Sequence, residues 1–271
     1  MPGINLPGVF LYLNCYSMMV ANPILSVQNL RKVYGNRAVV NNVSFNVEVG
    51  EIFGILGPNG AGKTTTLEMI ETLRSIDSGR IMLAGIDVAK NPQKIRSIIG
   101  VQLQAAAFMD KVKLTELLEM TAAAYGEKVD PMVFLKEVEL DDKRDSYFEN
   151  LSGGQKQRFS LAAALVHNPK VFFMDEPTTG LDPQARHNLW RLIRQIRKKG
   201  ITIILTTHYL EEAELLCHRV AIMDNGNIIA MDTPKNLILQ LLASGFKKQQ
   251  RLEQASLEDV FIDLTGKELR D

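Results

Sequence analysis

The chain has 271 residues, of which 46% are hydrophobic and 23% charged, and this predicts a globular protein of one domain, or one domain with a subdomain. Lysine plus arginine equals aspartate plus glutamate at 31 each, so the formal net charge of zero argues against a nucleic-acid partner. No apolar run reaches the roughly 18 residues of a membrane-spanning helix, and any membrane contact must therefore come through a partner.

Residues 1–22 are expected to be an extension that is not native or is disordered. The first 30 residues contain no charged side chain, and the first basic residue is Arg31. A secretory signal needs a basic segment before its apolar run, so secretion is discounted. We interpret the segment as an upstream extension with translation starting at Met18 or Met19, and a weak lipid-touching segment is the alternative.

Residues 24–49 alternate polar and apolar side chains, which predicts antiparallel strands around a turn. Tyr34 stands before a glycine at the end of the first of these strands. Considered alone it would be a core aromatic residue. Its place ahead of the next motif also allows it to stack on a purine ring.

A phosphate-binding loop, or P-loop, is predicted between an apolar strand at 51–56 and a helix starting at 64. Its residues are Gly57, Pro58, Asn59, Gly60, Ala61, Gly62, Lys63, Thr64 and Thr65. Glycines let the backbone curl around an anion, and the positive end of the helix dipole points at the same place. Lys63 can reach the β and γ phosphates, and the Thr64 hydroxyl is placed to ligate Mg²⁺. We expect Leu67, Ile70 and Leu73 to share one face of the helix.

The next segments are a turn at 77–80, a small hairpin element at 81–85, a short helix at 94–97 and a strand at 98–101. Gln102 and Gln104 follow that strand. From 114 to about 140, apolar residues at helical spacing, broken by Gly126 and Pro131, predict a helical insertion in the α/β chain.

A small cluster of polar residues and glycines then opens another helix, with the sequence Ser152, Gly153, Gly154, Gln155. By the same dipole argument the cluster is a second anion site, with Ser152 as the helix cap. Taken alone, such a cluster is more often only a cap.

Two carboxylates follow the buried strand at 171–174. Asp175 and Glu176 would stand at the C-terminal edge of a parallel sheet, where such sheets bind ligands. Asp175 can hold the Mg²⁺ shell, and Glu176 can orient or deprotonate a water molecule. Asp182 is the expected cap of the next helix. The strand at 201–206 delivers His208 to the same edge, where an imidazole can contact a γ-phosphate.

The chain ends with a hairpin at 220–229 around an Asn-Gly turn and with an amphipathic helical tail from 237 onward. We expect this tail to pack on the domain or to contact a partner.

In this order and spacing, the motifs resemble those of the ATP-binding subunit of an ABC transporter. The motifs are the P-loop, Gln104, the Leu151 to Gln155 signature (LSGGQ), Asp175-Glu176, Leu181-Asp182 and His208. The resemblance covers about 24–233. The segment 256–266 is also similar to the end of the daunorubicin-type drug-resistance branch, whose members pair with ABC-2 type permeases.

The resemblance implies an α/β fold: a P-loop NTPase (RecA-like) core with an antiparallel β subdomain and an α-helical insertion subdomain at about 105–165. It divides the chain into the 1–22 extension, a nucleotide-binding domain at 23–235 and a C-terminal helical tail at 236–271. It also implies a cytoplasmic protein that is peripheral on the membrane through its permease, powers transport in the export direction, and uses ATP and Mg²⁺.

For the site, the resemblance implies a head-to-tail dimer with two ATP molecules between the subunits. Tyr34 would stack on adenine, and the P-loop would hold the phosphates. The signature residues of the other protomer, Ser152 and Gly154 with Gly153 and Gln155 beside them, would cover the γ-phosphate. Gln104 would touch Mg²⁺ and report to the permease, Glu176 would be the catalytic base, and His208 would hold the γ-phosphate. Asp182 would communicate between the two sites.

Two alternatives stay open. Relatives often carry a polar or acidic residue after the position of Gln104, whereas this chain has alanine, so Gln102 competes for the coupling contact. The rival function is a soluble ABC-type ATPase acting on a ribosome or DNA complex. One cassette, no heptad run and no basic surplus favour the transporter, and a P-loop kinase would have no use for LSGGQ.

Overall fold

The computed structural model describes residues 23–102 and 108–244, which form two sheets and eight α-helices within those ranges. An antiparallel sheet has the order β2-β1-β4-β5, with β1 at Leu25–Tyr34, β2 at Arg37–Val47, β4 at Ser78–Leu83 and β5 at Ile86–Asp87. The paired strands at 24–49 are confirmed, since β1 and β2 form an antiparallel ladder from Leu25 opposite Val47 to Tyr34 opposite Arg37.

The second sheet has the order β10-β9-β3-β8-β7-β6. Its strands are β3 at Ile52–Leu56, β6 at Ile99–Gln102, β7 at Val171–Asp175, β8 at Thr202–Thr207, β9 at Arg219–Asp224 and β10 at Asn227–Asp232. All neighbours are parallel except β10, which forms a hairpin with β9. The C-terminal ends of β3, β7 and β8 therefore meet at one edge of this sheet.

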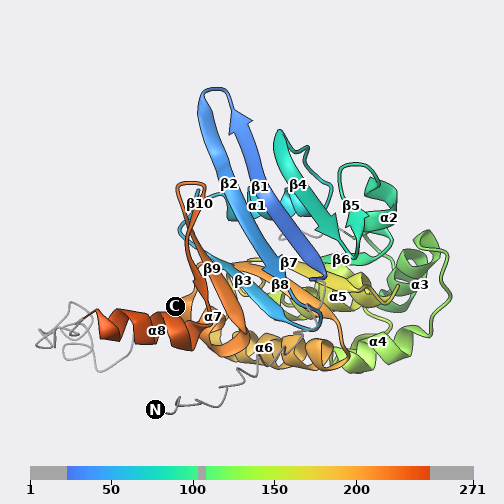
Figure 1. Ribbon diagram of the computed structural model, residues 1–271. Coiled ribbons are helices and arrows are strands. Elements are labelled where there is room, and N and C mark those ends of the chain that lie inside the picture. Colours follow the sequence, from blue (N-terminus) through green and yellow to red (C-terminus); the bar gives the residue numbers. More distant parts are fainter. Residues whose placement is uncertain (1–22, 103–107, 245–271) are drawn as a thin grey trace, which may run out of the picture.

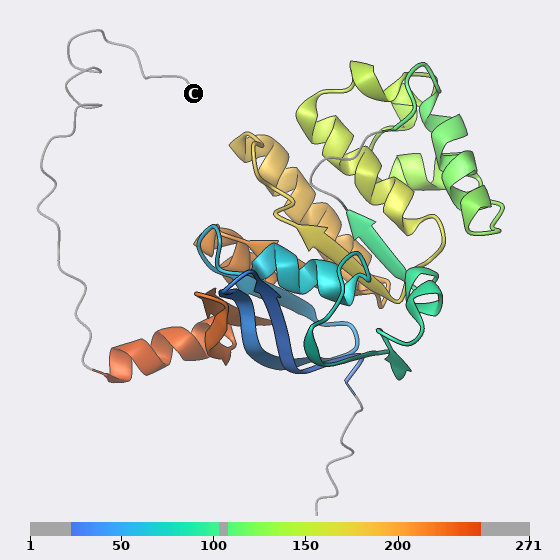
Figure 2. The ribbon, with the colours of Figure 1, turned by 90° about the horizontal axis from the view of Figure 1, so that it is seen from above.

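The parallel sheet separates two hydrophobic cores, which explains why its strands are continuous apolar runs. On one face Phe53, Ile55 and Phe173 pack with the antiparallel sheet and with α1, the helix at Lys63–Ile70. Figure 2 shows α1 lying between the two sheets. On the other face Phe172 and Ile203 pack against helices.

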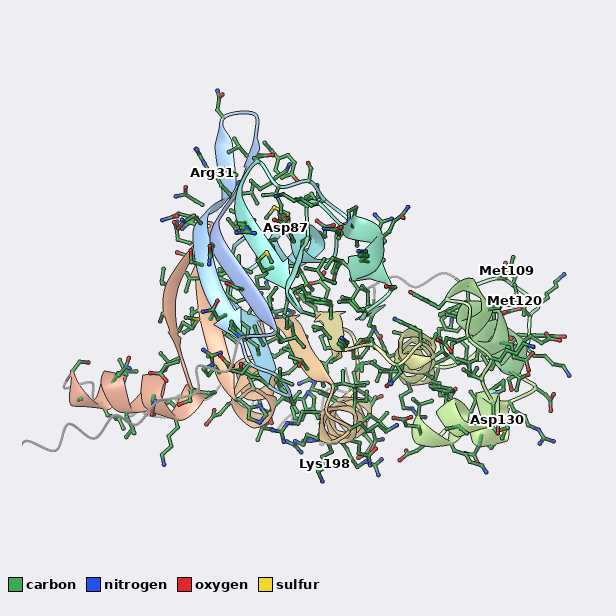
Figure 3. All side chains as sticks on the ribbon, turned by 45° about the vertical axis from the view of Figure 1, so that its right-hand side comes forward. Arg31, Asp87, Met109, Met120, Asp130 and Lys198 are labelled. Atoms are coloured by element: carbon green, nitrogen blue, oxygen red, sulfur yellow. The ribbon has the colours of Figure 1, made fainter. Side chains whose placement is uncertain are left out.

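The helices on that second face run from α3 to α7. They are α3 at Leu114–Ala124, α4 at Pro131–Glu137, α5 at Gly153–Leu165, α6 at Pro183–Lys198 and α7 at Leu210–Leu216. Two 3-10 turns, Asp141–Lys143 and Phe148–Asn150, link α4 to α5. The first three helices form the expected helical insertion, which projects to one side of the sheet (Figure 1). In Figure 3, Met109, Met120 and Asp130 mark its outer end, whereas Arg31 and Asp87 lie on the antiparallel sheet.

Two local expectations are wrong. Leu73 does not share a face with Leu67 and Ile70, because α1 ends at Ile70 and Thr72 takes a left-handed φ of 66°. Leu73 is therefore 57% exposed. The expected turn at 77–80 is instead largely the start of β4, where Arg80 pairs with Gln28 of β1.

The remaining helices are short segments at the periphery. Helix α2 at Pro92–Arg96 leads into β6 as expected. Helix α8 at Pro234–Ala243 begins just before the predicted tail boundary, with Thr233 as its cap, and none of its residues is buried. The predicted tail beyond 244 and the 1–22 extension lie outside the described residues. Within the described residues, no helix is long and apolar enough to cross a membrane.

Gly100 of β6 provides a test of how tightly α5 packs on the sheet. A Cβ there would lie 2.5 Å from the carbonyl oxygen of Ala164 and 3.0 Å from the Phe172 ring. We expect Gly100→Ala to lower the free energy of unfolding by about 1–3 kcal/mol, measured by urea unfolding. Gly153→Ala is the control, because a Cβ at Gly153 meets nothing within 4 Å. Equal stability of the two variants would contradict the packing.

Candidate nucleotide site

The P-loop is shaped by two positions that accept only glycine. A Cβ at Gly57 would lie 2.3 Å from the carbonyl oxygen of Met223, and one at Gly62 would lie 2.5 Å from that of Val39. Gly62 also has a φ of 100°, which glycine adopts without strain. No side chain caps the N-terminus of α1. Its first N–H groups are therefore available to an anion.

Lys63, the first residue of α1, is held at the mouth of this loop. Its ammonium donates to the carbonyl oxygens of Gly57 at 2.9 Å and Pro58 at 3.2 Å. It also lies 3.3 Å from Oε1 of Glu176. The side chain is only 4% exposed, so the positive charge is fixed by the loop and by one carboxylate. A cavity of about 140 Å³ opens here, lined by Val39, Asn59, Gly60, Gly62, Lys63, Thr64, Thr65 and Glu176.

The residues expected to hold Mg²⁺ are brought together from α1 and β7. The Thr64 hydroxyl lies 3.2 and 3.1 Å from the two carboxylate oxygens of Asp175. These hard oxygen donors fit Mg²⁺, which takes few protein ligands and completes its octahedron with water and phosphate oxygens. No cluster of three or more His, Cys, Asp or Glu residues suited to a metal occurs within 23–102 and 108–244.

Glu176 lies between two basic side chains. Its Oε1 faces Lys63, and its Oε2 lies 3.1 Å from Nδ1 of His208. Burial alone would raise the pKa of Glu176, but Lys63 and then His208 hold it below its ordinary value. The carboxylate is therefore ionised at neutral pH, as a general base requires. Its backbone takes a left-handed φ of 47°, which directs the residue out of β7.

Thr206 is a site residue that the sequence analysis did not single out. Its hydroxyl donates to Asp175 and accepts from the backbone N–H of Glu176 at 3.0 Å. It thereby fixes the two acidic residues to β8. The available signal was its position at the end of a core strand, next to Thr207 and His208.

The signature residues form a second, separate hollow. Ser152 caps α5 and forms a capping box with Gln155. The backbone N–H of Gln155 donates to the Ser152 hydroxyl at 3.4 Å, and the backbone N–H of Ser152 donates to the side-chain oxygen of Gln155 at 2.9 Å. Asp182 caps α6 by accepting from the N–H of Ala185 at 2.8 Å. Both caps border a hollow of about 340 Å³ that also includes Gly153 and Gly154. None of its lining residues lines the P-loop cavity.

Tyr34 and Gln102 line neither hollow. Tyr34 is 42% exposed at the end of β1, and its hydroxyl accepts from Arg74. Gln104 lies outside the described residues. Gln102 is buried at the end of β6, where its amide donates to Gln157 of α5 while its Oε1 has no partner among the described residues.

The fold and the site define a P-loop NTPase, and comparison with known proteins narrows this class. Residues 40–179 match the family described as ABC transporter. The chain is 38% identical to the linearmycin resistance ATP-binding protein of Bacillus subtilis, over 91% of this chain and 83% of that protein. It is 43% identical to a Nod factor export ATP-binding protein of Paraburkholderia xenovorans, over 79% of this chain and 72% of that protein.

Solved structures agree with this result. An ATP-binding subunit of an ABC transporter superposes with a TM-score of 0.73 at 30% identity, covering 89% of this chain and 99% of that one. A dimeric bacterial ABC transporter cassette superposes with a TM-score of 0.70 at 25% identity, over 77% of this chain and 98% of that one. The chain belongs to the ABC transporter family, as an ATP-binding subunit with ATPase activity.

Glu71, just beyond α1, should make the free energy of unfolding depend on pH. Burial, with smaller contributions from Asp175 and Glu68, raises the pKa of Glu71 to about 8. From about pH 5 to pH 8 the folded protein then keeps a proton that the unfolded chain has released, so the free energy of unfolding falls as pH rises. We expect Glu71→Gln to flatten this fall, so that the variant gains stability relative to wild type toward pH 8.

Urea unfolding at several pH values measures this effect. Glu119→Gln, which removes an exposed carboxylate from α3, is the control and should leave the slope unchanged. If the free energy of unfolding of wild type changes with pH as little as that of Glu71→Gln, then Glu71 does not keep its proton over this pH range.

Proposed function

We propose that this subunit dimerises on ATP and powers export through separate membrane subunits of the ABC-2 type. The observation that supports a dimer is that one chain has two half-sites that lie apart from each other. The P-loop cavity contains Lys63 and Glu176 but no signature residue, and the signature hollow contains Ser152 and Asp182 but no P-loop residue. One nucleotide therefore meets both half-sites when the P-loop of one protomer faces the signature of another.

The physical basis of this arrangement is the placement of two helix N-termini. Helix α1 offers its free N–H groups to the phosphates from one subunit, and α5, capped by Ser152, offers its own from the other. Gly153, Gly154 and Gln155 allow the second backbone to approach the γ-phosphate, and Asp182 lies beside them. The triphosphate charge would then hold the subunits together, and hydrolysis would release them.

In the proposed mechanism, Lys63 exchanges Glu176 for the phosphates when ATP binds. This removes the strongest influence that lowers the Glu176 pKa, so the carboxylate becomes a better acceptor for the proton of the attacking water. His208 then points its imidazole at the γ-phosphate. Thr64 and Asp175 would hold Mg²⁺, with Gln104 as a further ligand, and the ion supplies neutralisation of the phosphate charge. Tyr34 would turn from Arg74 to stack on adenine.

The membrane partner is supported by the relatives and by a groove. The two relatives compared above are named for resistance and for export. A largely apolar groove of about 400 Å³ lies between the core and the helical insertion and is lined by Leu73, Val101, Phe108 and Tyr125, among others. It borders the end of β6, beyond which Gln104 follows. We assign this groove to a cytoplasmic segment of the permease, which would place the subunit on the cytoplasmic face of the membrane. No nucleic acid is required.

ATP hydrolysis by wild type and Glu176→Gln tests the proposed chemistry. We expect wild type to hydrolyse ATP with Mg²⁺, and the variant to bind ATP with turnover reduced by about a hundredfold or more, because the general base is lost. In size-exclusion chromatography with ATP and Mg²⁺, the variant should elute as a dimer. Retained turnover and a monomeric elution volume would refute both the base and the dimer.

Mixing two inactive variants tests the head-to-tail geometry. Lys63→Ala disables the P-loop half-site, and Gly154→Asp disables the signature half-site by placing a negative charge near the γ-phosphate. Each alone should be inactive, but an equimolar mixture can form one intact site per heterodimer and should recover part of the activity. A mixture as inactive as its components would exclude composite sites.

Leu73→Glu tests the groove, because Leu73 is exposed and its substitution should not disturb folding. We expect unchanged ATPase activity of the isolated subunit and loss of ATP-dependent transport in vesicles that contain the membrane subunits. Met120→Glu is the matched control. Like Leu73, Met120 is exposed, but it lies on the helical insertion and does not line the groove. Equal transport by both variants would place the permease elsewhere.

A further inference from the structure

Two buried polar side chains line the groove between the core and the helical insertion. Glu71, the residue that follows α1, is 4% exposed, and Gln102, the last residue of β6, is 3% exposed. Both belong to the lining of the groove, which is otherwise largely apolar and includes Leu73, Val101 and Phe108. A partner that fills the groove therefore meets both polar groups.

The carboxyl group of Glu71 has neither a hydrogen-bond donor nor a basic partner among the described residues. Burial, Asp175 and Glu68 act on it, and all three raise its pKa, which reaches about 8. Arg74, three residues further on, pairs with Glu68 instead, at 2.6 Å. A buried carboxylate is costly unless it is paired and hydrogen-bonded. The ionised form of Glu71 thus lacks the cation that would stabilise it.

The side-chain amide of Gln102 is only half satisfied. Its nitrogen donates to the side-chain oxygen of Gln157 on α5. Its Oε1 is buried and has no hydrogen-bond partner among the described residues. A buried carbonyl oxygen without a donor lowers stability. Because Gln102 lines the groove, a ligand in the groove can supply the missing donor.

The basic residue in the described lining of the groove is not placed to pair with Glu71. Arg96, at the end of α2, is exposed, and its guanidinium donates to the hydroxyl and to the carbonyl oxygen of Thr72, at 2.8 and 3.2 Å. It does not contribute to the pKa of Glu71. Tyr125, whose ring stacks on His167 with 3.8 Å between the ring centres, adds an aromatic ring to the lining. Aromatic rings attract cations, so the groove favours a positive group.

We infer that the groove takes an apolar segment of the membrane subunits that carries an arginine side chain, whose guanidinium donates to Glu71 and Gln102. A guanidinium has five N–H donors in a planar fork and no acceptor, so it suits a site that offers a carboxylate and an amide oxygen. It is also more weakly hydrated than an ammonium group, which lowers the cost of burying it. The inference rests on the proposed function, which places the permease in this groove.

The isolated subunit can be tested with a small probe of the same chemistry. n-Hexylguanidinium joins an apolar chain to a guanidinium, and hexanamide and hexanoate are its neutral and anionic counterparts. An NMR titration at pH 8 measures each dissociation constant, and the amide shifts of Ile99 and Val101 show whether the probe lies in the groove. We expect hexylguanidinium to bind about tenfold or more tightly than the other two, because hydrogen bonds between charged groups are the strong ones.

Three variants identify the acceptors. Glu71→Gln removes the charge and should weaken the binding of hexylguanidinium by about tenfold or more, without changing the binding of hexanamide. Gln102→Leu keeps the volume but removes the oxygen without a partner, and it should weaken the same probe. Glu119→Gln is the matched control, since it removes an exposed carboxylate of α3 that does not line the groove, and it should bind like wild type.

Several results would overturn the inference. Equal binding of the three probes would mean that the groove selects only the apolar chain, and tighter binding of hexanoate would indicate Arg96 as the contact. No detectable binding of hexylguanidinium, or an unchanged affinity in Glu71→Gln, would also exclude the arginine.

Transport separates this inference from the proposed function. If Leu73→Glu abolishes transport in vesicles with the membrane subunits, while Glu71→Gln binds hexylguanidinium and transports like wild type, then only the recognition by Glu71 fails. If Leu73→Glu transports like wild type, the permease does not occupy the groove, and the proposed docking fails together with the inference.

Discussion

The ion pair between Lys63 and Glu176 is the interaction on which the arrangement of the site depends. A buried ammonium group is costly unless it is paired and hydrogen-bonded, and here two P-loop carbonyls and one carboxylate satisfy it. The pair joins the end of β3 to the end of β7, two strands that are separated by β8 in the sheet. This contact holds the Lys63 ammonium next to the Glu176 carboxylate, and in the proposed mechanism a nucleotide replaces it.

The strand between them completes this construction. Thr206 of β8 bonds to Asp175 and to the backbone of Glu176, and His208 follows two residues later. The polar side chains at the ends of β3, β7 and β8 therefore form one connected network at the edge of the sheet, and an apolar core covers each face of that sheet. Because both faces of the sheet are covered, the polar side chains gather at its C-terminal edge, where they can be hydrated or bound by ligand.

Much of this could be read from the sequence because the features are local. The P-loop, the two carboxylates after 171–174 and the caps Ser152 and Asp182 each follow from residue types at short spacing, and the structure places them at the expected strand and helix ends. Features that depend on tertiary contacts could not be read in this way. Leu73 fits a helical stripe, yet α1 stops at Ile70, and nothing local indicates that Thr206 meets Asp175, about thirty positions away. The contact between Tyr34 and Arg74 likewise brings together segments about forty residues apart.

The proposed division of the nucleotide site between two chains has a kinetic consequence. A site that needs two chains forms in a bimolecular step, so the activity per molecule of the isolated subunit should rise with protein concentration until dimers dominate. Two copies docked on one membrane complex would meet instead at a high effective concentration set by their tethering. On this view the membrane partner does more than use the energy of hydrolysis. By holding two cassettes together, it changes how the rate of ATP turnover depends on the concentration of the subunit.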